Sequence, residues 1–128
     1  MNIQYSIVQE EQIGKESSYQ KIENIVSMNL NKYIAEINWL SSKDGGRISD
    51  IPFNTNKYAP RIVIATMKES WSLVVNNFKR LSPLKTMAII YYLNVSAAPD
   101  NLYVGVNFEL FEGNKKVAFG TIVERYNK

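Results

Sequence analysis

A hairpin pattern near the C-terminal end of the chain constrains its fold more than any other feature. Residues 102–111 and 116–124 have the composition of strands, and Gly113-Asn114 stands between them. Gly-Asn is one of the dipeptides suited to a two-residue hairpin turn, because such turns need a residue with positive φ. This part of the sequence therefore predicts two antiparallel strands joined by a tight turn.

A second strand pattern lies in the first half of the chain. Apolar and polar side chains alternate along it, and the residues predicted to face inward are Tyr33, Ala35, Ile37 and Trp39. A period of two is typical of a strand with one buried face. The pattern ends at a turn cluster, where Gly45 and Gly46 predict a tight turn or bulge that needs positive φ.

The middle of the chain contains further strand-like segments. They are residues 61–67, 70–78 and 86–95. The last of them is apolar on both faces, as expected of a central strand. Pro83 predicts a break over residues 79–85, and residues 47–60 predict a long irregular connection. Several short strands at roughly ten-residue spacing favour an all-β antiparallel barrel or sandwich.

The N-terminal segment has a different pattern. Residues 16–28 place apolar side chains at intervals of three and four, which predicts a short helix, and an irregular arm is the alternative. A chain of 128 residues is the size of one domain. We therefore expect residues 1–29 to form an N-terminal arm or helix packed on a barrel, and residues 30–128 to form that single β-barrel domain.

The composition argues against an enzyme. The chain has no cysteine and no histidine. It therefore lacks thiol nucleophiles, the usual general base near neutral pH and the commonest transition-metal ligands. The remaining carboxylates suggest no acid–base pair. We expect no catalytic residue, no metal and no cofactor.

Charge and hydropathy bear on location and partners. The net charge of +3 is too small to indicate a nucleic-acid binder. The first residues show no basic stretch followed by an apolar one, and no apolar run approaches the ~20 residues that span a bilayer. We expect a soluble cytoplasmic protein without a membrane partner.

The order of several motifs resembles a known family. The motifs are residues 35–40, Asp44-Gly45-Gly46-Arg47, Ile51-Pro52-Phe53, Tyr58-Ala59-Pro60 and, near the end, Asn101-Leu102 through Phe108, Glu112-Gly113, Val117, Gly120 and Ile122. Together they resemble the C-terminal β-barrel of elongation factor Tu, its domain 3, over about residues 30–125. The resemblance implies an antiparallel β-barrel of that type, here with a short N-terminal helix or arm.

The resemblance also implies one function and argues against another. The phosphate-binding Gly-x-x-x-x-Gly-Lys-Ser/Thr loop of the family's GTPase domain is missing, so no nucleotide is expected. In the family, the loop after Gly-Gly-Arg helps to contact the T-stem of aminoacyl-tRNA, which implies Arg47 and Ser49 as RNA contacts. The family's His is Ile48 here, and its Tyr-Arg-Pro has Ala59 in the middle. A weakly RNA-binding accessory protein is therefore the alternative function.

The leading prediction is a non-catalytic protein-binding module, such as an antitoxin-like immunity protein. Recognition by a barrel falls to its loops, and Tyr and Arg are frequent anchors of interfaces. We therefore predict Arg47, Tyr58 and Arg61 as partner-binding residues. The competing interpretation is that Tyr58-Ala59-Pro60 only packs the long connection onto the barrel, and that Arg47 pairs within the protein.

Overall fold

The computed structural model describes residues 31–47 and 50–126, so the helix or arm predicted over residues 1–29 lies outside the described residues. The described part is all-β. Its strands are β1 (Lys32–Trp39), β2 (Arg61–Val63), β3 (Trp71–Ser82), β4 (Lys85–Tyr92), β5 (Asn107–Glu112) and β6 (Lys115–Tyr126). A single turn of 3₁₀ helix, η1 (Ser42–Asp44), follows β1.

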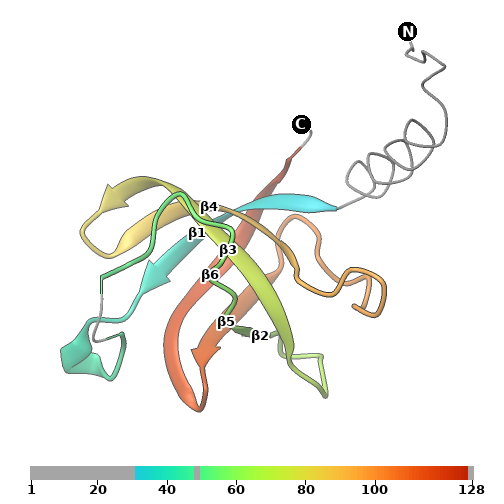
Figure 1. Ribbon diagram of the computed structural model, residues 1–128, viewed down its shortest axis with the longest axis horizontal. Coiled ribbons are helices and arrows are strands. Elements are labelled where there is room, and N and C mark those ends of the chain that lie inside the picture. The colour runs from blue at the N-terminus through green and yellow to red at the C-terminus, as the bar shows by residue number, and fades with distance from the viewer. Residues whose placement is uncertain (1–30, 48–49, 127–128) are drawn as a thin grey trace, which may run out of the picture. The chain divides into compact units, whose positions relative to one another are not determined.

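The six strands close into a barrel in the order β1-β4-β3-β2-β5-β6, and β6 returns to β1 (Figure 1). Every neighbouring pair is antiparallel. The predicted antiparallel barrel is thereby confirmed. Because β6 pairs with β1, each strand has a hydrogen-bonded neighbour on both sides, and the open edges that a flat sheet would expose are removed.

The core lies inside the barrel and follows the period of two. In β1, the four residues predicted to face inward are all buried. Strand β4 alternates in the same way, but its outward residues Met87, Ile89 and Tyr91 are apolar too and only half-exposed. The prediction of a central strand with two apolar faces is therefore confirmed for β4.

Four predicted strand boundaries are wrong. Strand β4 ends at Tyr92 instead of residue 95, and β5 begins at Asn107 instead of residue 102. Strand β3 continues to Ser82, whereas a break was expected from residue 79. Pro83 falls in the turn before β4, where no ladder hydrogen bond is needed, and two register shifts in β3 absorb the irregularity. Strand β2 ends at Val63 instead of residue 67, because the chain turns there and the amide of Met67 donates to the carbonyl of Ile64 at 2.8 Å.

Glycine is required for different reasons in the turns at residues 45–46 and 113–114. Gly45 has a φ of 83° and caps η1, and Gly113 has a φ of 63° in the β5–β6 hairpin, so positive φ is confirmed at both. The prediction of positive φ is wrong for Gly46, where glycine is required for space, since a Cβ there would lie 2.0 Å from the carbonyl oxygen of Leu40. The predicted hairpin at residues 113–114 joins β5 and β6 as expected.

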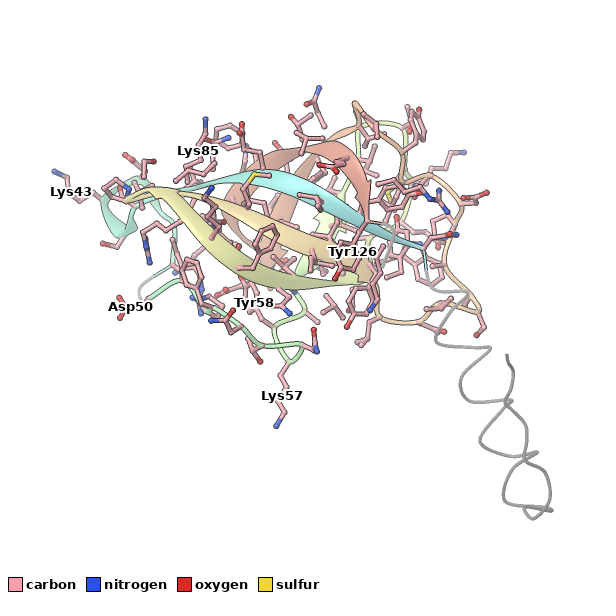
Figure 2. The ribbon with its side chains drawn as sticks, turned by 90° about the horizontal axis from the view of Figure 1, so that it is seen from above. Lys43, Asp50, Lys57, Tyr58, Lys85 and Tyr126 are labelled. Carbon is pink, nitrogen blue, oxygen red and sulfur yellow. The ribbon has the colours of Figure 1, made fainter. Side chains whose placement is uncertain are left out.

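The barrel has two distinct ends. Lys43 and Tyr126 lie at opposite ends (Figure 2). We call the end with η1 and the turns at residues 83–84 and 113–114 the hairpin end. We call the other, where β1 begins beside Tyr126 and residues 93–106 connect β4 to β5, the loop end.

The connection over residues 47–60 runs along β3 toward β2. The amides of Val75 and Leu73 in β3 donate to the carbonyls of Tyr58 and Pro60, at 3.0 and 2.9 Å. Phe53 forms a parallel bridge with Asn77. The connection is therefore hydrogen-bonded to the barrel through its backbone, which is the packing role considered for residues 58–60.

Candidate functional site

Two of the three predicted recognition residues meet at the hairpin end. The Nε of Arg47 and the hydroxyl of Tyr58 both donate to Oε2 of Glu112, each at 2.6 Å. Arg47 also donates from Nη1 to the carbonyl of Asp50. The side chain of Arg47 is only 16% exposed. Its guanidinium is therefore largely occupied by contacts within the protein.

Tyr58 is enclosed by its neighbours. The guanidinium of Arg47 stands 5.0 Å from the centre of the Tyr58 ring, and the ring of Trp39 lies 6.0 Å away at 43°. Burial, followed by the hydrogen bond and the negative charge of Glu112, raises the pKa of the Tyr58 hydroxyl well above its usual range, against a smaller opposing effect of Arg47. The hydroxyl is thus a permanent donor to Glu112 at neutral pH.

Arg61 belongs to a separate set of contacts on the β5–β6 hairpin. Its Nε and Nη2 donate to the carbonyl of Gly113 at 3.2 and 2.6 Å, and Nη1 donates to Ser70 at 2.8 Å. The guanidinium also lies 5.2 Å from the centre of the Phe111 ring. This arrangement ties the start of β2 to the turn between β5 and β6.

The predicted recognition surface is thus divided between two clusters of internal contacts. Arg47 and Tyr58 share Glu112, whereas Arg61 bonds to Gly113 and Ser70. A role in partner binding stays a prediction for these three residues. Ser49, the second RNA contact implied by the family resemblance, lies outside the described residues.

A chain of buried polar groups supports the same end of the barrel. The indole Nε1 of Trp39 donates to Oγ1 of Thr86 at 2.8 Å, and this hydroxyl donates to Oδ1 of Asn77 at 2.6 Å. The amide nitrogen of Asn77 then donates to the carbonyl of Pro52 at 2.8 Å. The chain crosses from β1 through β4 and β3 to the 47–60 connection, and Asn77 and Thr86 are fully buried.

The loop end has a different character. Four apolar side chains in residues 93–106 are between 46% and 65% exposed: Leu93, Val95, Tyr103 and Val104. Asp100 is the one charged residue in this segment of the sequence. Exposed apolar side chains also occur near the turn at the hairpin end, where Leu81 and Leu84 are 42% and 44% exposed, but those of residues 93–106 are more exposed.

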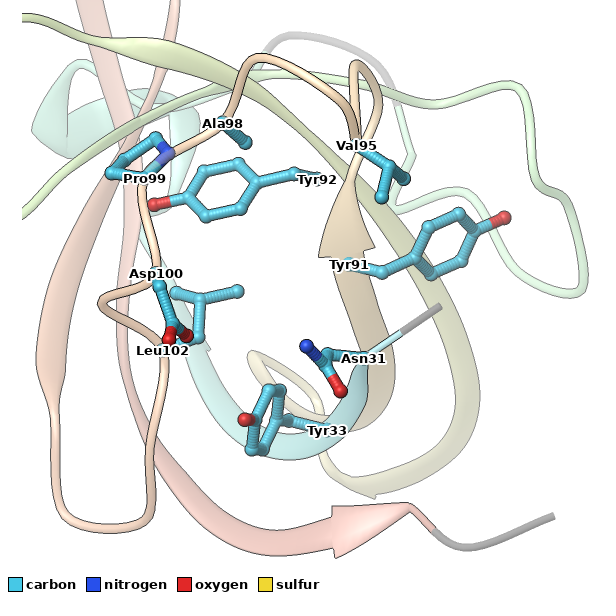
Figure 3. A pocket seen from close by; sticks show the side chains of 9 residues that line it. All are labelled: Asn31, Tyr33, Tyr91, Tyr92, Val95, Ala98, Pro99, Asp100 and Leu102. Atoms are coloured by element: carbon cyan, nitrogen blue, oxygen red, sulfur yellow. The ribbon is translucent and has the colours of Figure 1, made fainter. Parts of the chain in front are cut away.

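A pocket of 160 Å³ opens at the loop end (Figure 3). Its lining comes from the start of β1, the end of β4 and the connection, and consists of Asn31, Tyr33, Tyr91, Tyr92, Val95, Ala98, Pro99, Asp100 and Leu102. Tyr33, Tyr92 and Leu102 surround the open centre, whereas the ring of Tyr91 is directed outward. The pocket is therefore mostly apolar, with a few polar groups at its margin.

Hydrogen bonds and cations hold the tyrosines of this pocket in place. The hydroxyl of Tyr92 donates to Oδ1 of Asn101 at 2.6 Å. Burial raises the pKa of both Tyr92 and Tyr91. The guanidinium of Arg125 lies 5.6 Å from the Tyr33 ring centre, and the ammonium of Lys32 lies 5.0 Å from that of Tyr91.

The recognition residues were predicted from side-chain type, and none of them lines this pocket. No signal in the sequence marked it, because the apolar residues at both ends of this connection fall in segments predicted as strands, 86–95 and 102–111. Only the structure, in which β4 ends at Tyr92 and β5 begins at Asn107, shows that they belong to a connection.

The comparisons with known proteins add no assignment. No protein-family model matches this chain, and no curated protein matches it in sequence. Among residues 31–47 and 50–126, no three Asp and Glu side chains are grouped so that they can hold a metal ion. Within those same ranges, no helix is long and apolar enough to cross a membrane.

Proposed function

We propose that this protein is a non-catalytic, cytoplasmic protein-binding module, and that its loop end is the binding surface. The observation that carries the proposal is the exposure of Leu93, Val95, Tyr103 and Val104 beside a preformed apolar pocket. Interfaces characteristically have an apolar centre with aromatic anchors and a polar rim. The loop end of the closed barrel, whose exposed apolar side chains lie in one connection, provides that geometry.

We also propose that the barrel is of the elongation factor Tu C-terminal type. The proposal is supported by the closed antiparallel barrel, and by the turn at Gly45 and the hairpin at Gly113, which lie within the motifs that carry the resemblance. Among binding modules of this size, we favour an antitoxin-like immunity protein. Such a protein acts by covering the surface of a toxin, which needs shape and apolar area but no catalytic group.

RNA binding ranks below protein binding. Arg47, the described residue on which the RNA alternative rests, is paired with Glu112 and mostly buried. A phosphate group would have to replace a charged hydrogen bond of 2.6 Å that already exists. Among the described residues, by contrast, the exposed apolar side chains of the loop end form no ion pair that a partner would have to replace.

Site-specific photo-crosslinking in cells of the native host tests the proposal. A benzophenone amino acid replaces Tyr103 at the loop end in one variant and Lys57 in another, since Lys57 is exposed and extends away from the barrel (Figure 2). We expect a discrete, nuclease-resistant adduct at Tyr103 and none at Lys57. No adduct at Tyr103, or an adduct that nuclease removes, contradicts the proposal.

A further inference from the structure

We propose that the pocket at the loop end binds one uncharged aromatic ring that carries a hydrogen-bond donor, which is the chemistry of a phenol. Such a ring can belong to a free compound or to a tyrosine of a partner, so this inference does not rest on the proposed function. It is carried by the volume of the pocket, by its fixed apolar walls, and by the single carboxylate among its lining residues.

The volume of the pocket suits a single ring. It is 160 Å³, and an apolar cavity of roughly 150 Å³ is large enough to hold benzene. The centre is surrounded by Tyr33, Tyr92 and Leu102, which are between 6% and 7% exposed (Figure 3). An inserted ring would therefore exchange water for contacts with two aromatic side chains and an aliphatic one.

The walls of the pocket are held in place before any ligand binds. Tyr92 is fixed by its hydrogen bond to Asn101, and Tyr33 by the Arg125 guanidinium, whose Nη1 lies 3.4 Å from the Tyr33 hydroxyl. Arg125 is itself bonded through Nη2 to Asn31 at 3.0 Å. Preorganised walls reduce the entropy that binding would otherwise cost.

Asp100 supplies the one charged group of the pocket. It is the only charged side chain in the lining, and its carboxylate lies beside Leu102 at the margin of the open centre (Figure 3). Among the described residues this carboxylate forms no ion pair. An ionised carboxylate accepts hydrogen bonds and donates none. A ligand with a donor therefore suits Asp100, whereas an anionic ligand would be repelled.

The charges around the pocket cancel among the described residues. Three cations and three carboxylates lie at this end or beside it: Lys32, Lys68, Arg125, Glu69, Asp100 and Glu124. Their summed field therefore favours neither sign of charge in a ligand. A cationic ring is also disfavoured locally, because the rings of Tyr33 and Tyr91 already have cations 5.6 and 5.0 Å from their centres. An uncharged ring meets none of these penalties.

Four single-ring compounds test this chemistry on the full-length protein. p-Cresol, toluene, 4-methylbenzoate and 4-methylbenzylammonium are titrated against ¹⁵N-labelled protein by NMR. We expect p-cresol to shift the amides of Tyr33, Tyr92 and Leu102, and toluene to bind about fivefold more weakly because it has no donor. Both charged rings should bind more weakly than p-cresol. No binding of p-cresol, equal binding of toluene, or tighter binding of a charged ring overturns the inference.

Two matched pairs of variants locate the ring. Ala98→Phe fills the pocket from its wall, whereas Ala97→Phe adds the same ring at an exposed neighbour that does not line it. Asp100→Ala removes the acceptor, whereas Glu124→Ala removes an exposed carboxylate outside the lining. We expect Ala98→Phe to abolish binding of p-cresol. Asp100→Ala should abolish only the preference for p-cresol over toluene, and its retained binding of toluene shows that this variant is folded.

The two control variants should keep both the binding of p-cresol and its preference over toluene. Binding that survives Ala98→Phe overturns the inference, and so does a preference that survives Asp100→Ala. Loss of the preference in Glu124→Ala to the same extent as in Asp100→Ala also overturns it, because Glu124 is outside the lining.

A peptide distinguishes the two sources of the ring. N-acetyl-Gly-Tyr-Gly-amide is titrated beside p-cresol under the same conditions. Tighter binding of the peptide supports the inference with a tyrosine of a protein partner as the ligand, and tighter binding of p-cresol supports it with a free compound. Photo-crosslinking at Tyr103 tests the proposed function alone, so the two proposals fail separately.

Discussion

Tyr58 and Glu112 share a hydrogen bond of 2.6 Å that joins the 47–60 connection to the end of β5. The residues are 54 positions apart in the chain. Because Glu112 also pairs with Arg47, one carboxylate fastens two points of the long connection to the barrel. The residues predicted to bind a partner therefore hold the protein together at its hairpin end.

Glu112→Gln should destabilise the protein. The change removes the charge that Arg47 and Tyr58 both use, in a partly buried site, and we expect a loss of about 1–3 kcal/mol in the free energy of unfolding. Urea denaturation measures it. Glu124→Gln, at an exposed position of β6, is the control and should change stability by less than about 0.5 kcal/mol. Equal effects of the two substitutions would contradict the role of Glu112.

Stability should fall above pH ~10 partly because of Tyr58. Its pKa is raised in the folded protein, mainly by burial, so the unfolded state loses this proton first. The stabilising contribution is complete below the unfolded pKa and is lost as the pH rises beyond it. Tyr58→Phe should therefore be less stable at pH 7 but decline less steeply between pH ~10 and ~11. Urea denaturation at each pH measures the free energy of unfolding. If it declines equally steeply with pH in the wild type and in the variant, Tyr58 is not the cause.

Thr86→Val should cost about 2–4 kcal/mol. The substitution preserves shape but removes the hydroxyl that serves both Trp39 and Asn77, leaving two buried polar groups without this partner. Thermal unfolding measures the loss. Thr121→Val is the matched control, since Thr121 makes a hydrogen bond to Asn107 that is exposed to solvent. A similar melting temperature for both variants would show that the buried chain contributes little.

Gly46→Ala should be more harmful than Gly45→Ala. A Cβ at Gly46 would collide with the backbone of Leu40, and we expect a loss of about 2–3 kcal/mol. At Gly45 a Cβ meets nothing within 4 Å, so the cost is the positive φ alone, about 1 kcal/mol. Denaturant titration of the two variants distinguishes them. The opposite ranking would indicate that the turn rearranges around residue 46.

The features that could be predicted are those set by neighbouring residues. The inward face of β1 follows from alternation within eight residues, and the β5–β6 turn follows from Gly113 and its flanking strands. The end of β3 could not be predicted in the same way. Pro83 marks a turn, but whether the strand reaches it depends on the register with β4, which includes two shifts.

The candidate site was predictable only in part. Side-chain type pointed to Arg47, Tyr58 and Arg61, yet their availability depends on acceptors far along the chain at Glu112 and Gly113. The loop-end pocket combines residues 31–33, 91–92 and 95–102, which no local pattern links. Closure of the barrel brings them together.

The sequence by itself determined the strand periodicity, the tight turns and the lack of thiol and imidazole chemistry, because each of these depends on residue type and short-range order. The tertiary structure decided which strands pair, which charged groups form hydrogen bonds within the protein, and which apolar residues remain exposed. The physical reason is that an arginine or a tyrosine has the same chemistry everywhere, whereas its freedom to bind a partner depends on whether the closed barrel brings an acceptor within hydrogen-bonding distance.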